Sequence, residues 1–158
     1  RCDKKYIERV LRECSAIKAR IVEQDERDNK NVRVILNLGH TIGHAIETAS
    51  GYGKSYNHGQ AVALGIQASL YISRKIRLCK DSDSHRIKNL IKNIGLPVCL
   101  KNVNIKNILS AERRDKKFIH GKNRFVLPVR IGKVIVKEGI PEKLVREAIE
   151  SLYGFKKR

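Results

Sequence analysis

The 158-residue sequence lacks several features that mark whole classes of protein. It has no tryptophan and only 5% aromatic residues, so a base-stacking surface for single-stranded nucleic acid is poorly supplied. No apolar run approaches the ~18–20 residues that a membrane span requires, and we expect no signal peptide. The GxGxxG fingerprint and an alternation of strands and helices are both missing. We therefore expect this chain to carry no dinucleotide-binding fold of its own.

The sequence contains four cysteines, and none of them are in CxxC spacing. This spacing indicates neither a zinc knuckle nor a redox pair. Four free thiols fit a reducing compartment, so we expect a cytoplasmic protein. Each cysteine is interpreted as a small buried or half-buried apolar residue; they are Cys2, Cys14, Cys79 and Cys99.

Positive charge dominates the sequence, with 34 Lys and Arg against 16 Asp and Glu and a net charge of +18. Such a surface can hold nucleic acid, an acidic partner or a small anionic substrate. The basic residues are dispersed along the whole chain, which argues against nucleic acid as the partner. A basic helical module that binds nucleic acid remains the alternative from a different functional class.

Hydrophobic spacing predicts one mainly α-helical domain over residues 1–158 with a single small β-hairpin. Asp3 is the expected N-cap of the first helix, and Asn104 that of the fifth. The hairpin is expected to pair residues 125–129 with residues 133–137. The helices are expected near residues 4–24, 32–49, 58–78, 81–95, 104–114 and 140–154.

The segment from 32 to 49 is mostly apolar, which predicts a helix that is buried on nearly all sides. Its polar exceptions are spaced by 4, 3, 4 and 3 residues and would form one stripe on that helix. Burying such groups is costly unless something pairs with them, although neighbouring loops could also satisfy the stripe. The stripe contains Arg33, Asn37, His40, His44 and Glu47.

His40 and His44 have the i, i+4 spacing that lets one helix present two ligands to a metal. The metalloprotease motif requires Glu directly after the first His, and Thr41 stands there instead. A second possibility is that His40 is a ligand while His44 has a catalytic role. His58 begins the next predicted helix, after a glycine-containing loop that can fold back toward the first two histidines.

These motifs resemble 3-dehydroquinate synthase. Residues 36–47, LNLGHTIGHAIE, are similar to the family signature LNxGHTxGHAIE, and residues 58–63, HGQAVA, are similar to HGEAVA. Residues 17–27 resemble the KAxVVxxDERE segment, and residues 115–117 resemble the DKK before the hairpin. The resemblance implies the family's helical C-terminal domain, so we expect the NAD-binding N-terminal domain to be absent from this chain.

The resemblance also implies residue roles. His40 and His58 resemble the family's metal-binding histidines, with the third ligand, a Glu, expected outside this chain. Zinc or cobalt is the implied metal, NAD is the implied cofactor, and His44, Lys18 and Asn37 are the implied catalytic residues. The implied substrate is 3-deoxy-D-arabino-heptulosonate 7-phosphate, a sugar phosphate of the shikimate pathway, which is converted to 3-dehydroquinate plus phosphate. The residues implied to contact it are Lys18, Arg33, Asn37, His44 and Lys116.

Two departures from the family pattern stand out. Gln60 replaces the usual Glu after His-Gly, and a Glu there could tune His58 from behind the metal. The loop before Arg33 is one residue longer than usual. Another sugar-phosphate cyclase is the alternative within the same fold, but retention of both Asn37 and His44 favours dehydroquinate synthesis. The family further implies a homodimer and no membrane partner, and this chain alone is expected to be inactive.

Overall fold

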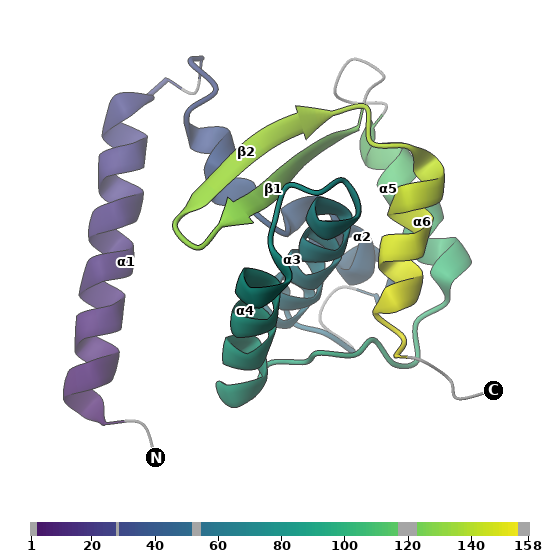
Figure 1. The fold of residues 1–158 in the computed structure, drawn as a ribbon, viewed down its shortest axis with the longest axis horizontal. Coiled ribbons are helices and arrows are strands. Elements are labelled where there is room, and N and C mark those ends of the chain that lie inside the picture. Colours follow the sequence, from purple (N-terminus) through teal and green to yellow (C-terminus); the bar gives the residue numbers. More distant parts are fainter. Residues whose placement is uncertain (1–2, 28, 52–54, 117–122, 155–158) are drawn as a thin grey trace. The chain divides into compact units, whose positions relative to one another are not determined.

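The computed structural model of the chain describes residues 3–27, 29–51, 55–116 and 123–154. These residues form six α-helices, one short 3-10 helix and one antiparallel hairpin (Figure 1). The expectation of a mainly helical fold with one hairpin is confirmed. Internal contacts divide the chain into two compact units, Arg1–Leu36 and Asn37–Arg158. That the two act as one domain stays a prediction.

The first unit contains α1 (Lys4–Gln24) and most of the 3-10 helix η1 (Arg33–Asn37). Helix α1 begins as predicted, because the Asp3 carboxylate accepts a hydrogen bond from the Lys5 amide at 3.1 Å. The turn after α1 is organised by the buried carboxylate of Asp25, which accepts four backbone N–H groups at 2.8–3.3 Å. One of those four N–H groups belongs to Arg33.

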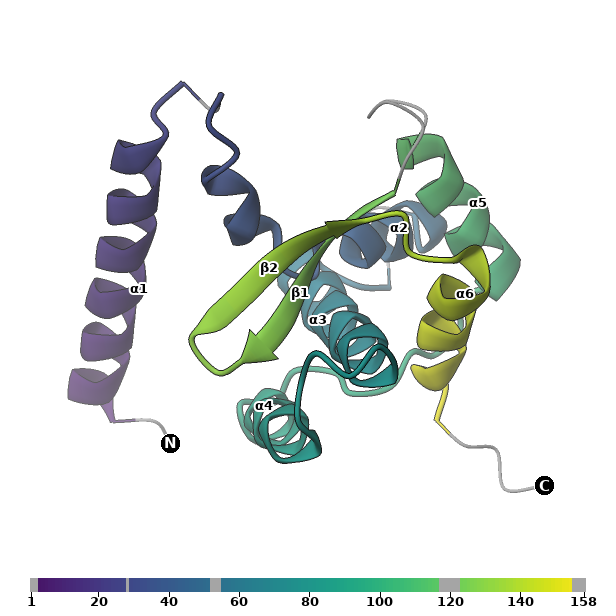
Figure 2. The same cartoon turned by 45° about the horizontal axis from the view of Figure 1, so that its top comes forward.

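In the second unit, α3 is the central element. It packs against α2, α4, α6 and the first strand, β1 (Figures 1 and 2). Strand β1 pairs with β2 in an antiparallel register that sets Val126 opposite Val136 and Leu127 opposite Ile135. The elements are α2 (His40–Ala49), α3 (His58–Lys75), α4 (Asp81–Asn93), α5 (Ile105–Lys116), β1 (Arg124–Arg130), β2 (Lys133–Glu138) and α6 (Glu142–Ser151).

One apolar core holds these elements together. Helices α2, α3, α5 and α6 each contribute side chains, and β1 covers them with Phe125 and Leu127. A fully buried aliphatic side chain stabilises the fold by about 1.5–3 kcal/mol relative to leaving it in water. The largest fully buried apolar side chains are Ile42, Ile46, Leu64, Ile72, Ile108, Phe125, Leu127, Val145, Ile149 and Leu152.

The predicted continuous helix over 32–49 is wrong. The chain forms η1, then turns through Leu38 and Gly39, and begins α2 only at His40. Gly39 has φ +80°, in the left-handed region that glycine adopts without strain. The apolar periodicity continues through this turn, so the break has no hydrophobic signal. Consequently neither Arg33 nor Asn37 is on a common helical stripe with the histidines.

Most other element boundaries lie within a few residues of the prediction. Asn104 caps α5 as expected, since its side chain accepts the Lys106 amide at 2.8 Å. Helix α4 differs slightly, because Lys80 occupies the N-cap and Asp81 and Asp83 lie inside the first turn. Acidic groups there still favour the positive end of the helix dipole.

The cysteine expectation holds only in part. Cys79 is buried, whereas Cys14 and Cys99 are exposed, which corrects the interpretation of those two as buried residues. Cys2 lies outside the described residues. Within the described ranges, no helix combines the length and the apolar character needed to cross a membrane.

Candidate metal and substrate site

Helix α2 presents three polar side chains on one face. His40, His44 and Glu47 follow each other at i, i+4 and i+7, while the opposite face buries Ile42 and Ile46 in the core. The first turn is fixed from outside the helix, because the Thr41 hydroxyl donates to the carbonyl of Arg124 in β1 at 3.0 Å. This part of the predicted stripe is therefore retained.

His58 is positioned by the start of α3. Asn57 caps the helix by accepting the Gln60 amide at 2.9 Å, and the Gln60 side chain accepts the Asn57 amide at 3.0 Å. These two reciprocal bonds form a capping box. The preceding residue, Tyr56, is buried and its hydroxyl bonds both the amide and the carbonyl of Lys101. The chain therefore enters α3 along a fixed path.

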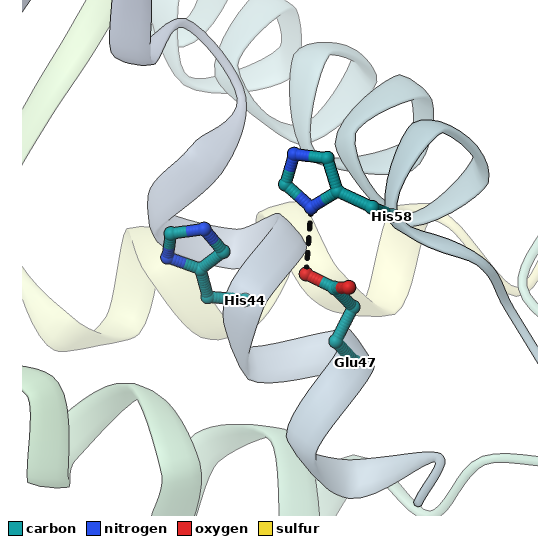
Figure 3. A group of neighbouring side chains, drawn as sticks. All are labelled: His44, Glu47 and His58. Carbon is teal, nitrogen blue, oxygen red and sulfur yellow. Dashed lines mark hydrogen bonds and ion pairs between the residues drawn. The ribbon is translucent and has the colours of Figure 1, made fainter. Parts of the chain in front are cut away.

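The two helices bring three imidazoles together. The ring centroid of His40 lies 5.3 Å from the centroid of His44 and 5.3 Å from that of His58. The ring centroids of His44 and His58 lie 5.9 Å apart. Glu47 completes the cluster, because its Oε2 lies 3.0 Å from Nδ1 of His58 (Figure 3). We call His40, His44, Glu47 and His58 the histidine cluster.

Electrostatics favour a neutral His40. Burial lowers the pKa of this imidazole, and the neighbouring His44 and His58 lower it further. The Leu38 carbonyl and Glu47 oppose this shift without reversing it. Because Nδ1 of His40 lies 3.2 Å from the Leu38 carbonyl oxygen, a proton on Nδ1 would leave Nε2 free as a ligand.

The donor set fits a transition metal of the zinc type. Neutral imidazole nitrogens and a carboxylate oxygen are the ligands that zinc commonly takes in catalytic sites. Among the described residues, His44, Glu47 and His58 form a group whose possible ligand atoms all lie within 4.8 Å of one another. The family resemblance assigns metal binding to His40 and His58, and this assignment stays a prediction.

The other predicted site residues occupy different parts of the chain. Asn37 is exposed at the end of η1 and is the first residue of the second unit. Lys18, exposed on α1, and Arg33, the first residue of η1, both belong to the first unit. Lys116 is the last residue of α5, and its side chain lies outside the described part of the structure.

Two residues of functional interest are not marked as site residues by the sequence. The sequence indicates Glu47 only as a member of the polar stripe, although its i, i+3 spacing from His44 places it beside the imidazoles. Asp25 is the Asp of the DER segment, and only the folded loop shows that it binds four amides. Burial would raise the pKa of this carboxyl, but the four N–H bonds outweigh burial and lower the pKa.

Comparison with known proteins agrees with the motifs. The family described as "3-dehydroquinate synthase C-terminal" matches residues 1–118. This chain belongs to the 3-dehydroquinate synthase family. A 3-dehydroquinate synthase of Buchnera aphidicola subsp. Baizongia pistaciae is 42% identical over 142 residues, which is 89% of this chain. One from Crocosphaera subtropica is 40% identical over 147 residues, or 92% of this chain. The chain spans only 39% and 40% of the lengths of these two relatives.

Solved structures that share this fold include those of sugar-phosphate cyclases. A 2-deoxy-scyllo-inosose synthase complexed with carbaglucose-6-phosphate, NAD+ and Co2+ matches with a TM-score of 0.79 and 25% identity. That match covers 93% of this chain and 41% of the synthase. A 2-epi-5-epi-valiolone synthase from Streptomyces hygroscopicus subsp. jinggangensis 5008, with NAD+ and Zn2+ bound, matches with a TM-score of 0.78. Its sequence is 19% identical to this chain, and the match covers 90% of this chain and 39% of the synthase. At this low identity the match shows the fold alone.

Proposed function

We propose that this chain is the metal- and substrate-binding half of a 3-dehydroquinate synthase. The reaction converts 3-deoxy-D-arabino-heptulosonate 7-phosphate to 3-dehydroquinate and phosphate. The histidine cluster carries the proposal, because two helices bring three imidazoles and a carboxylate together. The ring centroids lie 5.3–5.9 Å apart, and Oε2 of Glu47 lies 3.0 Å from Nδ1 of His58. A purely structural role would not need three adjacent titratable rings on a surface of the fold.

His40 and His58 would hold zinc or cobalt, with a further carboxylate from outside this chain. A metal bound there supplies Lewis acidity, which lowers the pKa of a coordinated hydroxyl and polarises a carbonyl. Glu47 accepts the Nδ1 proton of His58, which directs Nε2 toward the ligand position. His44 lies beside both rings, where its imidazole can donate or accept a proton.

The substrate carries a phosphate and a carboxylate, and cations are needed for both. Lys18, Arg33 and Lys116 are the cations that the family resemblance assigns to this role. An arginine can hold a phosphate or carboxylate with two parallel hydrogen bonds. Asn37 would bond a hydroxyl without adding charge. NAD would be bound mainly outside this chain, and a homodimer of the whole enzyme stays a prediction.

A second candidate is another sugar-phosphate cyclase, since solved cyclases share the fold. Sequence identity favours dehydroquinate synthesis. The two 3-dehydroquinate synthases are 40–42% identical to this chain, whereas the 2-deoxy-scyllo-inosose synthases are 24–25% identical. Purified enzyme assayed with 3-deoxy-D-arabino-heptulosonate 7-phosphate and with a hexose 6-phosphate separates the two candidates.

Alanine variants in the whole enzyme test the assignment of roles. His40→Ala and His58→Ala should lose both metal and activity, whereas His44→Ala should lose activity and keep the metal. Metal content measured by mass spectrometry alongside product formation gives both readouts. An empty His44→Ala variant together with a metal-loaded His40→Ala variant would reverse the assignment.

A further inference from the structure

A groove of about 520 Å³ lies between α5 and α6, and basic side chains dominate its walls. The two helices lie side by side in both views of the fold (Figures 1 and 2). The volume is within the range of small-molecule sites. None of the lining residues belongs to the histidine cluster; they are Lys106, Leu109, Ser110, Arg113, Arg114 and Arg146.

Helix α5 supplies five of these residues from one face. The spacing 106, 109, 110, 113, 114 is the i, i+3, i+4, i+7, i+8 pattern of neighbours along a helix. Lys106 and Arg114 are therefore about 12 Å apart along the helix axis. Arg146 contributes a further cation from α6 on the other side of the groove.

The charges in the groove are not balanced. Arg113 pairs with Glu142 at 3.0 Å, which neutralises one of the four cations. Lys106, Arg114 and Arg146 form no ion pair with the acidic side chains that the structure describes. Gathering like charges destabilises a fold, and a bound anion relieves that repulsion.

We propose that the groove between α5 and α6 binds a small molecule that carries two or more phosphate groups. Guanidinium groups bind phosphate oxygens bidentately, and unpaired cations spread over about 12 Å of α5 suit linked phosphates better than a single one. The described lining residues include no aromatic ring, so they offer a nucleobase no aromatic stacking partner. The phosphate chain is therefore the recognised part of the ligand.

The test is calorimetric titration of the metal-free protein with tripolyphosphate and with inorganic phosphate, since a bound metal would itself chelate polyphosphate. Tripolyphosphate should bind more tightly than phosphate. The double variant Lys106→Gln/Arg146→Gln should weaken tripolyphosphate binding by about 10- to 100-fold, because each charge-assisted contact removed costs roughly tenfold.

A matched control removes the same charge elsewhere. Lys88 and Lys92 are exposed on α4, outside the groove, and the double variant Lys88→Gln/Lys92→Gln should bind tripolyphosphate almost normally. Equal losses in the two double variants would show a diffuse field and overturn the proposal. Loss of tripolyphosphate binding in His44→Ala would place the ligand at the substrate site, and tighter binding of a duplex oligonucleotide would indicate nucleic acid instead. Either result would also overturn it.

Discussion

The substitution Gly65→Ala should drive α3 away from the start of α2. A Cβ at position 65 would lie 1.9 Å from the Gly39 carbonyl oxygen and 2.9 Å from the Gly43 amide nitrogen. Both contacts are with backbone atoms, so no rotation of a side chain can relieve them. Restoring ordinary van der Waals separation from the Gly39 oxygen requires the two segments to move apart by about 1.5 Å.

The cost follows from this geometry. Overfilling a packed interior typically costs about 1–3 kcal/mol, and a clash with rigid backbone belongs at the upper end of that range. At about 3 kcal/mol, a protein of this size should lose roughly 6–12 °C in Tm. The movement should also widen the 5.3 Å spacing between the His40 and His58 rings, because these residues begin the two helices. Metal binding should therefore weaken together with stability.

Gly59→Ala is the matched control. It is a glycine of the same helix next to His58, and its added Cβ would meet only Asn57 Oδ1 at 3.7 Å, an ordinary contact. This variant should be neutral or slightly stabilising, because alanine favours the helix over glycine. Thermal denaturation and zinc titration of both variants measure the two effects. A Gly65→Ala protein with an unchanged Tm and unchanged zinc affinity would refute the close helix contact.

Three further predictions concern individual side chains. Glu47→Gln should weaken zinc binding by about 10- to 100-fold without unfolding the protein, because it removes the carboxylate that orients His58; zinc titration and circular dichroism check this. Asp25→Asn should loosen the loop before Arg33. In the native protein the pKa of Asp25 is lowered, so the stabilisation of this loop by the ionised carboxylate is fully present above the ordinary carboxyl pKa. This stabilisation is lost as pH falls through the lower pKa of the folded protein, and NMR of the Arg33 amide against pH follows the loss. In the whole enzyme, Arg33→Ala should weaken substrate binding by roughly 10- to 150-fold, whereas Lys88→Gln should change it little; equal effects would indicate a diffuse field.

The sequence predicts the secondary structure well where periodicity and caps agree. Asp3 and Asn104 are short polar residues placed just before apolar repeats, and both act as caps. The hairpin is equally direct, because two runs rich in β-branched residues flank a Gly-containing turn, and β1 and β2 form there. Local chemistry determines these features, so no distant contact is needed to predict them.

The break at Gly39 depends on a distant contact instead. A Cβ added at Gly39 would lie 2.7 Å from the Ile66 amide nitrogen and 2.7 Å from the Val62 carbonyl oxygen. The backbone of the turn and the backbone of α3 therefore come close together here. Glycine inside an apolar run is also compatible with a continuous helix, which is why periodicity alone predicted one. What decides between them is the packing of α3 against the turn, and that packing lies more than twenty residues away along the chain.

The histidine cluster shows how such packing determines chemistry. Replacement of the family Glu by Gln60 suggested a changed environment for His58, yet the Gln60 side chain is used in the capping box, a role that Glu also performs. The carboxylate that meets His58 comes from Glu47, on the helix that carries His40 and His44. Orientation of His58 therefore requires α2 and α3 to be held at their observed separation. Because Gly39 and Gly65 set that separation through backbone contact, two residues without side chains determine whether the imidazoles can share one ligand.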